Sequence, residues 1–524
     1  MGHPVSDQID RNLFGVLARQ AHGPNRHREA VRIDDDACTF ASLSDRATRV
    51  GNALLTLGLV PGDRVGVLLR NSLEWVELLF AMAQTGLVCV PINVLLSPAE
   101  VSKLCDDADV RAFVLDDSGA EAYQRLPEPP FLTVRVGDVD VAPSTTRVVN
   151  YDELLTASPL FTGRGPSLHD PLIFYYTSGT TGLPKGSVHT HNGVLWNAFH
   201  QIPDLGVGRD EAYLVVPSLS WAAGFNDVMI SALWAGGRSV LMPTGGVTME
   251  RVVETVERNG ITRALLVPTL LKQLVHDEPL QQRLRDSSMT SILTGSEPVP
   301  LPVISALMDA IPNVAIMQGY GLSEFPTVAT MLSADEAVPR VGTAGRPTSV
   351  TDLAVLTSTG EIVGEGEGEV LLRSPATMQE YWRRPEETAE AFIDGWLHTG
   401  DLGRVDDDGY LTITGRMKDM IISGGMNIYP SEIESVLYRV DGVREASVVG
   451  VPDERWGEVP VAVIVASAGF DTADLDALCV QELSSYKRPR HVLVRQDELP
   501  KSPTGKVLKR ELSPWATDQL RGAR

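Results

Sequence analysis

The sequence predicts an α/β protein: a large N-terminal domain of doubly wound sheets with a β-rich subdomain, and a small α+β C-terminal domain. Its 524 residues are too many for one hydrophobic core and indicate two or more domains. Up to about residue 340, short apolar runs alternate with segments of helical period, which is typical of parallel sheets covered by helices. After about residue 341, Gly-rich turns separate short strands, which favours antiparallel structure.

The N-terminal elements follow this alternation in order. Apolar residues at helical spacing predict helices over residues 42–57 and 73–84, and a continuous apolar run predicts a strand at 65–69 between them. Further strands and helices are expected by the same rule. The strands are residues 172–176, 213–216, 239–242 and 264–267, and the helices are 226–234 and 249–259. In such sheets, ligands collect at the carboxyl ends of the strands.

The C-terminal third has shorter elements. Residues 364–368 alternate Gly and Glu and predict a solvated hairpin, and residues 406–409 predict a hairpin turn because they lack the spacing of a calcium loop. The expected strands are 369–372, 446–451 and 459–466, and helices are expected to begin at Ser431 and Thr472. This part of the chain is therefore expected to be a β-rich subdomain followed by an α+β unit.

The composition excludes several classes of protein. The formal net charge of −23 argues against a general nucleic-acid or anionic-membrane surface, because neutralising phosphates needs clustered Lys and Arg. The longest apolar region, residues 78–96, is interrupted by polar residues, Gly and Pro, so no membrane span is predicted. Only four cysteines occur, none at metal-ligand spacing, which favours a reduced, cytoplasmic protein.

Residues 176–186 have the composition of an anion-binding loop. They contain four Ser or Thr hydroxyls, three glycines and Lys185. Glycine lets backbone N–H groups converge on phosphate oxygens, while hydroxyls donate further hydrogen bonds and the lysine supplies positive charge. The loop is not a Walker A sequence, because Pro184 stands where that motif needs glycine before its lysine. A Gly- and Thr-rich surface loop without function is the alternative interpretation.

This loop resembles the phosphate-binding signature of the acyl-adenylate-forming (AMP-binding) superfamily, which includes acyl-CoA synthetases, adenylation domains of peptide synthetases and firefly luciferases. Four further segments resemble that family's motifs in the same order along the chain, and the whole is most like stand-alone acyl-CoA synthetases. The segments are residues 320–324, 396–401, 415–434 and 499–506. The resemblance therefore spans residues 176–506.

The resemblance implies an ATP-dependent acid:CoA ligase. Such an enzyme forms an acyl-adenylate and pyrophosphate, and then an acyl-CoA thioester after rotation of a small, mobile C-terminal domain. It implies an N-terminal AMP-binding domain at 1–415 (β-rich part about 341–415), a hinge at 416–418 and a C-terminal domain at 419–524. The expected ligands are a small carboxylic or related acid, ATP, Mg²⁺ and coenzyme A, and a homodimer is possible. The alternatives are transfer of the activated acid to a carrier protein or another acceptor, and a non-catalytic nucleotide-binding sensor.

The resemblance also implies roles for individual residues. Residues of the phosphate loop and of three other segments would bind ATP or AMP: Thr177, Ser178, Gly179, Thr180, Thr181, Lys185, Gly295, Ser296, Glu297, Tyr320, Gly321, Asp401 and Arg416. Ser323, Glu324 and Lys506 are the catalytic candidates, with Glu324 at the magnesium position and Lys506 acting in adenylation. Lys418 is the expected hinge residue. Ser220, Trp221 and Gly319 would line the acid pocket, and Gly424 and Gly425 the CoA tunnel.

The sequence departs from the family's pattern at two places. Many members carry a Pro-x-x-His segment whose histidine gates the acid pocket, whereas Ser220 stands at that position after Pro217 here. Ser323 stands where Thr is usual, and its hydroxyl is expected to keep the contact with the α-phosphate. Alternatives stay open for single residues. Glu324 could be a surface residue that opens a helix, and Tyr320 a core aromatic. Asp401 and Arg416 could belong to ordinary surface ion pairs, and Lys506 could be a solvated turn lysine. The identity of the acid is not readable.

Overall fold

The computed structural model describes residues 12–141, 146–177, 185–295, 299, 301–424, 426–453, 455–467, 469–501 and 507–522. The chain divides into two compact units. The first comprises Met1–Val341, Gly345–Asp352 and Arg373–Leu397, and the second comprises Gly342–Ala344, Leu353–Leu372 and His398–Arg524. The expected hinge at 416–418 lies inside the second unit, and the domain boundary expected there stays a prediction.

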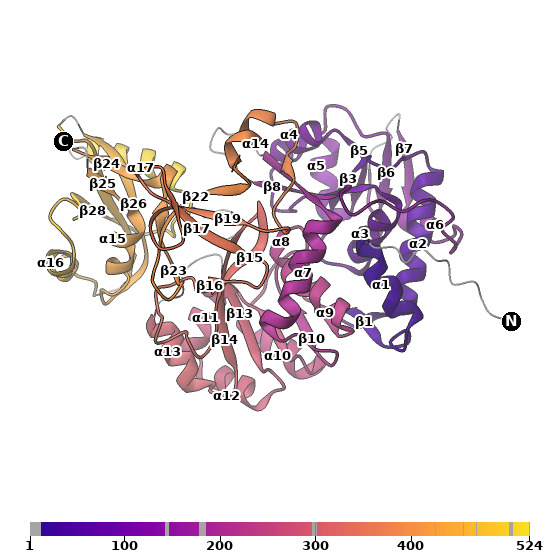
Figure 1. Cartoon of the computed structure of the whole chain (residues 1–524), viewed down its shortest axis with the longest axis horizontal. Helices are drawn as coiled ribbons and strands as arrows, with labels where there is room; N and C mark the ends of the chain where they lie inside the picture. Colours follow the sequence, from indigo (N-terminus) through magenta and orange to yellow (C-terminus); the bar gives the residue numbers. More distant parts are fainter. Residues whose placement is uncertain are drawn as a thin grey trace. The chain divides into compact units, whose positions relative to one another are not determined.

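The first unit contains an eight-stranded sheet in the order β20-β9-β8-β4-β3-β5-β6-β7 (Figure 1). The strands are β3 (Arg64–Leu68), β4 (Val88–Pro91), β5 (Val110–Leu115), β6 (Leu132–Arg135), β7 (Arg147–Asn150), β8 (Pro171–Thr177), β9 (Lys185–Thr190) and β20 (Glu380–Tyr381). Pairing is parallel from β8 through β7, whereas β9 and β20 add antiparallel strands at one edge. The phosphate loop expected from the sequence connects β8 to β9 at this edge.

A nine-stranded sheet forms the rest of the framework of this unit, in the order β16-β15-β14-β13-β12-β10-β11-β1-β2. Its strands are β1 (Glu29–Ile33), β2 (Asp36–Thr39), β10 (Ala212–Val215), β11 (Arg238–Leu241), β12 (Arg263–Leu265), β13 (Ser291–Gly295), β14 (Ala315–Leu322), β15 (Phe325–Leu332) and β16 (Arg346–Pro347). In this order, the neighbours from β14 through β1 pair in parallel. The pairs β1–β2 and β14–β15 are antiparallel. Two sheets of this kind are the doubly wound architecture that the sequence predicts.

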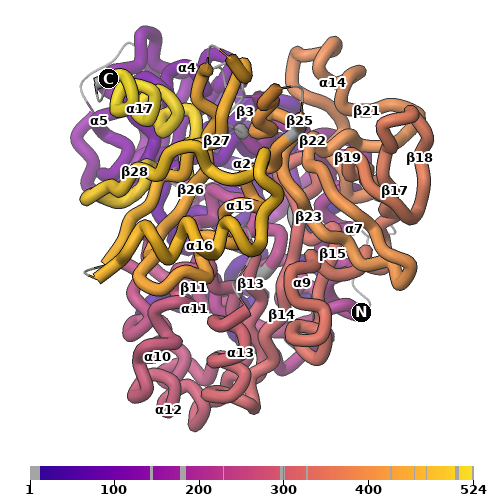
Figure 2. Tube along the Cα trace, turned by 90° about the vertical axis from the view of Figure 1, so that its left-hand side faces the viewer, coloured from indigo at the N-terminus to yellow at the C-terminus, as the bar shows by residue number. Residues whose placement is uncertain are grey.

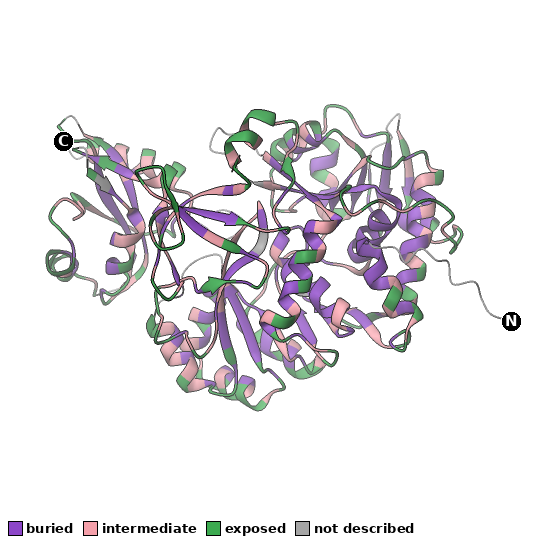
Figure 3. Cartoon of the chain, in the orientation of Figure 1, coloured by how far each residue is buried: buried purple, intermediate pink, exposed green. Residues whose placement is uncertain are grey.

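Helices flank both sheets, and Figure 3 shows that most of them are partly buried, whereas the helix at residues 385–391 has no buried residue. They are α1 (Leu13–His22), α2 (Phe40–Thr56), α3 (Leu73–Thr85), α4 (Pro98–Ala108), η1 (Asp117–Gly119), α5 (Ala120–Gln124), α6 (Tyr151–Leu154), α7 (His191–Leu205), α8 (Ala222–Gly224), η2 (Phe225–Met229), α9 (Ile230–Ala235), α10 (Met249–Asn259), α11 (Pro268–Val275), α12 (Glu278–Asp286), α13 (Leu301–Ala310) and α14 (Pro385–Ala391). The helix expected at 226–234 differs in detail, because η2 is a π-helical turn that leads into α9.

Helix α3 explains the long apolar region of the sequence. Ser72 caps its N-terminus by accepting a hydrogen bond from the Trp75 N–H, and Gly86 ends it in a left-handed conformation at φ 78°. Every residue of α3 from Trp75 onward is buried, including Glu77, which pairs with Arg46 at 2.5 Å, so the helix is enclosed on all sides. Among the described residues, no helix is long and apolar enough to cross a membrane.

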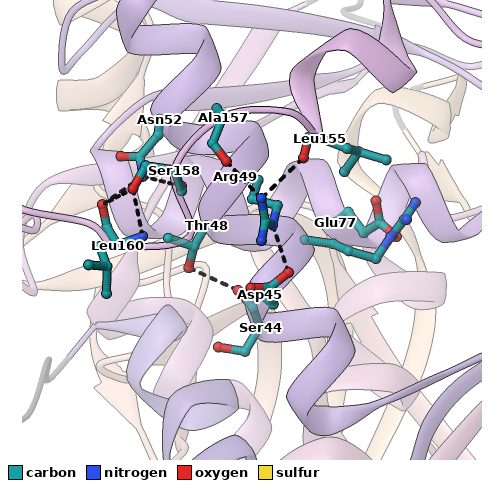
Figure 4. A network of polar contacts seen from close by, with 11 residues as sticks. Ser44, Asp45, Thr48, Arg49, Asn52, Glu77, Leu155, Ala157, Ser158 and Leu160 are labelled. Carbon is teal, nitrogen blue, oxygen red and sulfur yellow. Dashed lines mark hydrogen bonds and ion pairs between the residues drawn. The ribbon is translucent and has the colours of Figure 1, made fainter.

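Helix α2 holds the segment after α6 through polar contacts (Figure 4). The Arg49 guanidinium donates to the carbonyl of Ala157 at 2.9 Å and pairs with Asp45 at 2.8 Å. The Asn52 amide donates to the carbonyls of Ser158 and Leu160 at 2.8 and 2.9 Å. These side-chain contacts satisfy loop carbonyls that no strand or helix pairs.

The second unit begins with antiparallel strands and ends in a five-stranded sheet. Its elements include β17 (Asp352–Leu356), β18 (Ile362–Val363), β19 (Gly366–Arg373), β22 (Trp396–Val405), β23 (Leu411–Arg416), η3 (Met417–Asp419), β24 (Ile421–Ser423), β25 (Met426–Ile428), α15 (Pro430–Leu437), β26 (Val443–Asp453), β27 (Gly457–Ala466), α16 (Thr472–Glu482), β28 (His491–Arg495) and α17 (Lys509–Gly522). The short β21 (Phe392–Ile393) forms a hairpin with Trp396 and Leu397 of the first unit. The change to β-rich structure after residue 341 is as expected.

The five-stranded sheet has an apolar core on each face. Because side chains alternate along a strand, Ala462 and Ile464 of β27 belong to one buried cluster, with α15 and α16, and Val461 and Val463 belong to another, with α17. Both α15 and α17 contact β26, and these orange-to-yellow elements can be followed in Figure 2. This gives the second unit an α+β core of its own.

Candidate active site

The expected phosphate loop lies between two paired strands. Thr177, the last residue of β8, pairs with Lys185, the first residue of β9. Ser178, Gly179, Thr180 and Thr181 lie outside the described residues, as does the side chain of Thr177. The strands therefore place the two ends of the loop side by side, and Lys185 is the one candidate of this segment whose side chain is described.

Lys185 lies between an aromatic ring and a carboxylate. Its Nζ atom is 5.3 Å from the centroid of the Tyr381 ring, within the range of a cation–π interaction. The same atom is 4.0 Å from Oε1 of Glu387, at the start of α14. Its side chain is 24% exposed, so the ammonium is held against the protein and still reaches solvent.

Ser323 and Glu324 form the turn of the β14–β15 hairpin. Leu322 pairs with Phe325, so these two residues alone connect the strands. The alternative in which Glu324 opens a helix is therefore wrong, because the chain continues directly into β15. Tyr320 lies on β14, three residues before Ser323, and is half-buried, so its ring is not enclosed as a core aromatic would be. Gly321 and Leu322 separate it from the turn.

Tyr381 joins Glu324 to Lys185, and the sequence analysis missed it. Its hydroxyl donates a hydrogen bond to Oε1 of Glu324 at 2.8 Å, while its ring lies beneath the Lys185 ammonium. Strand β20 brings it there by pairing with β9, with Tyr381 opposite Ser187. No local signal in the sequence predicts this contact, because Glu324 and Tyr381 are 57 positions apart and β20 belongs to a different sheet from the β14–β15 hairpin.

Two buried polar side chains of β9 support the turn. The Ser187 hydroxyl lies 3.0 Å from the Tyr175 carbonyl oxygen and 3.4 Å from that of Ser323. His189 lies behind it, with Nε2 3.1 Å from the Ser187 hydroxyl. Complete burial lowers the pKa of His189 from 6.5 to about 3, so its imidazole is neutral at physiological pH. Val188 is the one apolar side chain of β9, so the sequence of this strand gives no signal that Ser187 and His189 are buried.

The glycines expected around the adenine and the acid lie on neighbouring strands. Gly295 ends β13 and pairs with Gly319 of β14. A Cβ atom on Gly295 would lie 2.6 Å from the Gly319 carbonyl oxygen, so a side chain cannot be added there without moving a strand. Ser296 and Glu297, the other two residues of this expected loop, lie outside the described residues.

The segment that replaces the family's gate histidine is held by a buried asparagine. The Asn71 amide donates to the carbonyls of Pro217 and Met242 at 3.1 and 2.9 Å, and its oxygen accepts from the Leu219 N–H at 2.7 Å. Ser220 is buried, with its hydroxyl 2.8 Å from that of Ser218, and Trp221 is half-buried at the start of α8. Asn71 therefore determines the backbone position of the expected acid gate.

Buried polar groups follow this gate on the π-helical turn η2. Asn226 is fully buried, and neither its amide oxygen nor its nitrogen has a hydrogen-bond partner among the described residues. Gln201 of α7 donates to the Asn226 carbonyl at 3.0 Å and to Oδ1 of Asp227 at 3.4 Å. Burial raises the pKa of Asp227 well above its usual value. π-Helical turns often occur at functional sites, and nothing in the apolar periodicity predicted this one.

Asp401 and Arg416, the candidates for the ribose, form an ion pair in the second unit. Nε of Arg416 lies 2.8 Å from Oδ1 of Asp401, and the Asp401 side chain is 4% exposed. Upstream on β22, the Thr399 hydroxyl donates to the Val370 carbonyl at 2.7 Å and accepts from the Asp401 N–H at 3.1 Å. The Asp401 carboxylate is therefore held by Arg416, and its backbone N–H by the Thr399 hydroxyl.

The remaining candidates lie at the start of the C-terminal elements. Lys418 is exposed in the 3-10 turn η3. Gly424 has φ 58°, and a Cβ atom there would lie 2.6 Å from the Trp456 ring, so glycine is required at this position. Gly425 and Lys506 lie outside the described residues. The structure assigns Asp401, Arg416, Lys418 and Gly424 to the second unit, and the other described candidates to the first.

The donor set at Glu324 fits a hard cation that is shared with phosphates. In the described part of the chain, no three His, Cys, Asp or Glu side chains are grouped to hold a metal ion. Glu324 offers one carboxylate, and only its Oε1 atom has a hydrogen bond among the described residues. Mg²⁺ is commonly bound through one or two carboxylates together with substrate phosphates, so a single carboxylate beside a phosphate loop suits it.

The chain is similar to known enzymes over nearly its whole length. The model of the AMP-binding enzyme family matches residues 17–382, and that of the AMP-binding enzyme C-terminal domain matches residues 432–506. Feruloyl-CoA synthase of Amycolatopsis sp is 37% identical over 489 residues, which cover 93% of this chain and 95% of the relative. Long-chain-fatty-acid–CoA ligase FadD13 of Mycobacterium tuberculosis is 37% identical over 507 residues, 95% of this chain and 97% of the relative.

One further relative and two solved structures bear on the chemistry. The fatty acid–acyl-carrier-protein ligase ScoC of Streptomyces coeruleorubidus is 35% identical over 513 residues, 92% of each chain. The anthranilate CoA ligase AuaEII in complex with anthranoyl-AMP has a TM-score of 0.87 and 27% identity, covering 99% of both chains. The o-succinylbenzoate CoA synthetase of Bacillus subtilis in complex with ATP and magnesium ion has a TM-score of 0.82 and 27% identity, covering 95% of this chain and 98% of that chain.

Proposed function

The chain belongs to the AMP-binding enzyme family, and from that premise we propose that it is an AMP-forming acid–thiol ligase, an ATP-dependent acid:CoA ligase. One observation carries the proposal most directly: Lys185 and Glu324 converge on Tyr381 beside the ends of the phosphate loop. Positive charge at a phosphate loop stabilises the departing pyrophosphate, and a carboxylate beside it can hold Mg²⁺, so this arrangement suits the reaction.

In the first step, a carboxylate oxygen of the acid attacks the α-phosphorus of ATP, and pyrophosphate leaves from the other side. Negative charge accumulates on the phosphate oxygens, and Lys185 and the hydroxyls of the phosphate loop would stabilise it. Glu324 would hold Mg²⁺, which supplies further positive charge on the phosphates when it is bound. Ser323 would contact the α-phosphate, and Lys506 would contact both the carboxylate and the α-phosphate. These assignments are proposals that rest on the family motifs and the turn geometry.

We propose that the nucleoside is bound by the residues that the family motifs assign to it. Tyr320 would stack on the adenine, with Gly321, Gly295, Ser296 and Glu297 around it. Asp401 would accept hydrogen bonds from the two ribose hydroxyls, because an ionised carboxylate offers two acceptor oxygens. Arg416 supports this assignment, since its guanidinium already neutralises and orients that carboxylate.

In the second step, the thiol sulfur of CoA attacks the acyl carbonyl, AMP leaves, and the thiol proton is released. We propose that residues 416–418 are the hinge for this step, with the domain 419–524 rotating about Lys418. Gly424 and Gly425 would then border the pantetheine, because glycine lets the thiol arm pass close to the backbone. The exposed 3-10 turn at Lys418 supports a hinge, since a short exposed turn can absorb changes in φ and ψ.

A carrier protein is the alternative acceptor, since ScoC is a ligase of that kind. The names of the relatives support an aromatic or a fatty acid as substrate, with Ser220, Trp221 and Gly319 in the acid pocket.

Two further proposals concern location and assembly. The four buried free cysteines support a cytoplasmic location. A homodimer is the proposed assembly.

Pyrophosphate release from ATP and Mg²⁺ tests the function. Short, long-chain and aromatic acids are supplied with and without CoA, and wild type is compared with Lys506→Ala. Acid-dependent release with a CoA thioester is expected, and Lys506→Ala should lose release yet still form thioester from a preformed acyl-adenylate. Release without thioester would favour another acceptor. If no acid supports release, the ligase proposal is wrong.

A further inference from the structure

The segment around Tyr381 is fastened to the site by its backbone. The Met378 N–H donates to the Glu324 carbonyl at 2.8 Å, and the Gln379 N–H donates to the Val188 carbonyl at 2.7 Å. On the far side of Tyr381, the Trp382 N–H donates to the Gly186 carbonyl at 2.8 Å. The segment is therefore tied both to the Ser323–Glu324 turn and to β9 immediately after Lys185.

Side chains on either side of Tyr381 make this attachment rigid. The Trp382 indole donates to the Asp107 carbonyl at 3.1 Å and packs on Phe174, with ring centroids 4.9 Å apart. The Tyr381 N–H donates to the Thr388 hydroxyl at 3.0 Å, and that hydroxyl donates to the Arg384 carbonyl at 2.7 Å. These contacts fix the backbone on both sides of Tyr381, and thereby the direction in which its side chain leaves the strand.

The phenol hydroxyl and the ring act on different partners. The hydroxyl donates to Oε1 of Glu324 at 2.8 Å, which fixes the rotation of that carboxylate and leaves Oε2 as the oxygen for a cation. The ring face lies 5.3 Å from Nζ of Lys185 and limits the conformations of a long, flexible side chain.

We propose that Tyr381 is a positioning residue that aligns the cation-binding carboxylate of Glu324 with the phosphate-binding ammonium of Lys185, so that both meet one Mg²⁺–polyphosphate. The inference rests on the proposed function. Its two contacts are separable: the hydroxyl serves the cation, and the ring serves the phosphate charge. Groups that orient a metal ligand commonly change metal affinity or activity by about 10- to 100-fold when removed.

Calorimetric titration of ATP, with Mg²⁺ and separately in EDTA, tests this without relying on turnover. Tyr381→Phe keeps the ring and removes the hydroxyl. We expect its ATP affinity in EDTA to equal that of wild type. The factor by which Mg²⁺ increases the ATP affinity should be smaller than in wild type by about tenfold. Tyr381→Leu also removes the ring, so it should weaken binding in EDTA as well. In turnover, Tyr381→Phe should raise the Mg²⁺ concentration for half-maximal pyrophosphate release and leave the KM for the acid unchanged.

Two controls separate positioning from folding. Tyr123→Phe removes another buried hydroxyl, which pairs with Thr133 at 2.8 Å away from the site, and should leave both titrations unchanged. In a Glu324→Gln background, Tyr381→Phe should have no further effect on the Mg²⁺ increment, because the group it orients is gone. Thermal unfolding of each variant confirms that it is folded.

The inference is overturned if Tyr381→Phe responds to Mg²⁺ as wild type does, or if it loses ATP affinity equally with Mg²⁺ and in EDTA. Failure of the proposed function gives a different result. A protein that binds ATP with Mg²⁺ but releases no pyrophosphate with any acid would refute the ligase assignment, and the titrations would still decide the role of Tyr381.

Discussion

Asp401 and Arg416 lie directly opposite each other on β22 and β23, and their backbone pairing and their ion pair coincide. A buried carboxylate is costly unless it is paired and hydrogen-bonded, so the guanidinium and the strand register together hold the Asp401 carboxylate at one position. Arg416 is also the last residue before the turn that contains Lys418.

Asp401→Asn should weaken ATP binding through the ribose. A hydrogen bond to a charged group contributes about 1.5–3 kcal/mol, so the KM for ATP should rise by about 10- to 100-fold. The variant should also lose much of the discrimination between ATP and 2′-deoxy-ATP, which initial-rate kinetics with both nucleotides measures. Asp407→Asn, an exposed carboxylate in the turn after β22, is the control. Unchanged discrimination in Asp401→Asn would exclude the ribose assignment.

Lys418→Pro should separate the two half-reactions. Proline fixes φ near −65° and restricts the preceding residue, so a turn that must change its backbone angles cannot do so. Adenylation should continue, while thioester formation from preformed acyl-adenylate should slow by at least about tenfold. Lys418→Ala keeps backbone freedom and should behave like wild type. Equal loss of both steps, or equal effects of Pro and Ala, would contradict a hinge at this residue.

The buried histidines should make the fold sensitive to mild acid. Burial lowers the pKa of His191 from 6.5 to about 4, so between these values the unfolded chain binds a proton that the folded chain refuses. Stability is therefore lost as pH falls through 6.5 toward 4, by at most about 1.4 kcal/mol per pH unit for this group.

Urea unfolding at pH 7.5 and pH 5.0 measures this loss. In His191→Asn, the Asn oxygen can still accept the Leu13 N–H that His191 Nδ1 accepts at 3.3 Å, so the variant should lose less stability between the two pH values than wild type does. His22→Asn, at an exposed position, should not change the difference. An identical pH response in His191→Asn and wild type would disprove the prediction.

Asp227→Asn should stabilise the protein at neutral pH. The pKa of Asp227 is raised by burial, so above its unfolded value of 3.8 the unfolded chain releases a proton that the folded chain keeps, and stability falls as pH rises. Asn removes this penalty and keeps an oxygen for the contact with Gln201. The melting temperature should exceed that of wild type at pH 7, with the gain shrinking toward pH 4. A gain independent of pH would refute it.

The periodicity of the sequence predicted most elements well. The expected helix at 249–259 is α10, and the expected strand at 65–69 is β3 shifted by one residue. These elements pack through a repeating apolar face, which local sequence records directly. The expected helix at 226–234 contains a π-helical turn, which the apolar spacing of this short segment did not predict.

Candidate residues were singled out from the sequence only where they belong to a contiguous motif. Ser323 and Glu324 stand in such a motif, although their place in a hairpin turn was not predicted. Tyr381 and Asn71 were missed because each acts on a segment distant in sequence, through sheet pairing in one case and a side-chain amide in the other. Every residue has a backbone carbonyl, so the sequence does not show which carbonyl needs a side-chain donor.

Asn71 gives the proposed acid gate a property that bears on how such enzymes diversify. By binding the backbone at Pro217, Leu219 and Met242, it fixes the course of the chain next to Ser220 and Trp221, which we propose to face the acid. Exchanges of these two residues, on the connection between β10 and α8, should therefore leave the backbone in place. New substrates become accessible through single substitutions on an unchanged scaffold, so a library restricted to these two positions is where a search for altered acid preference should begin.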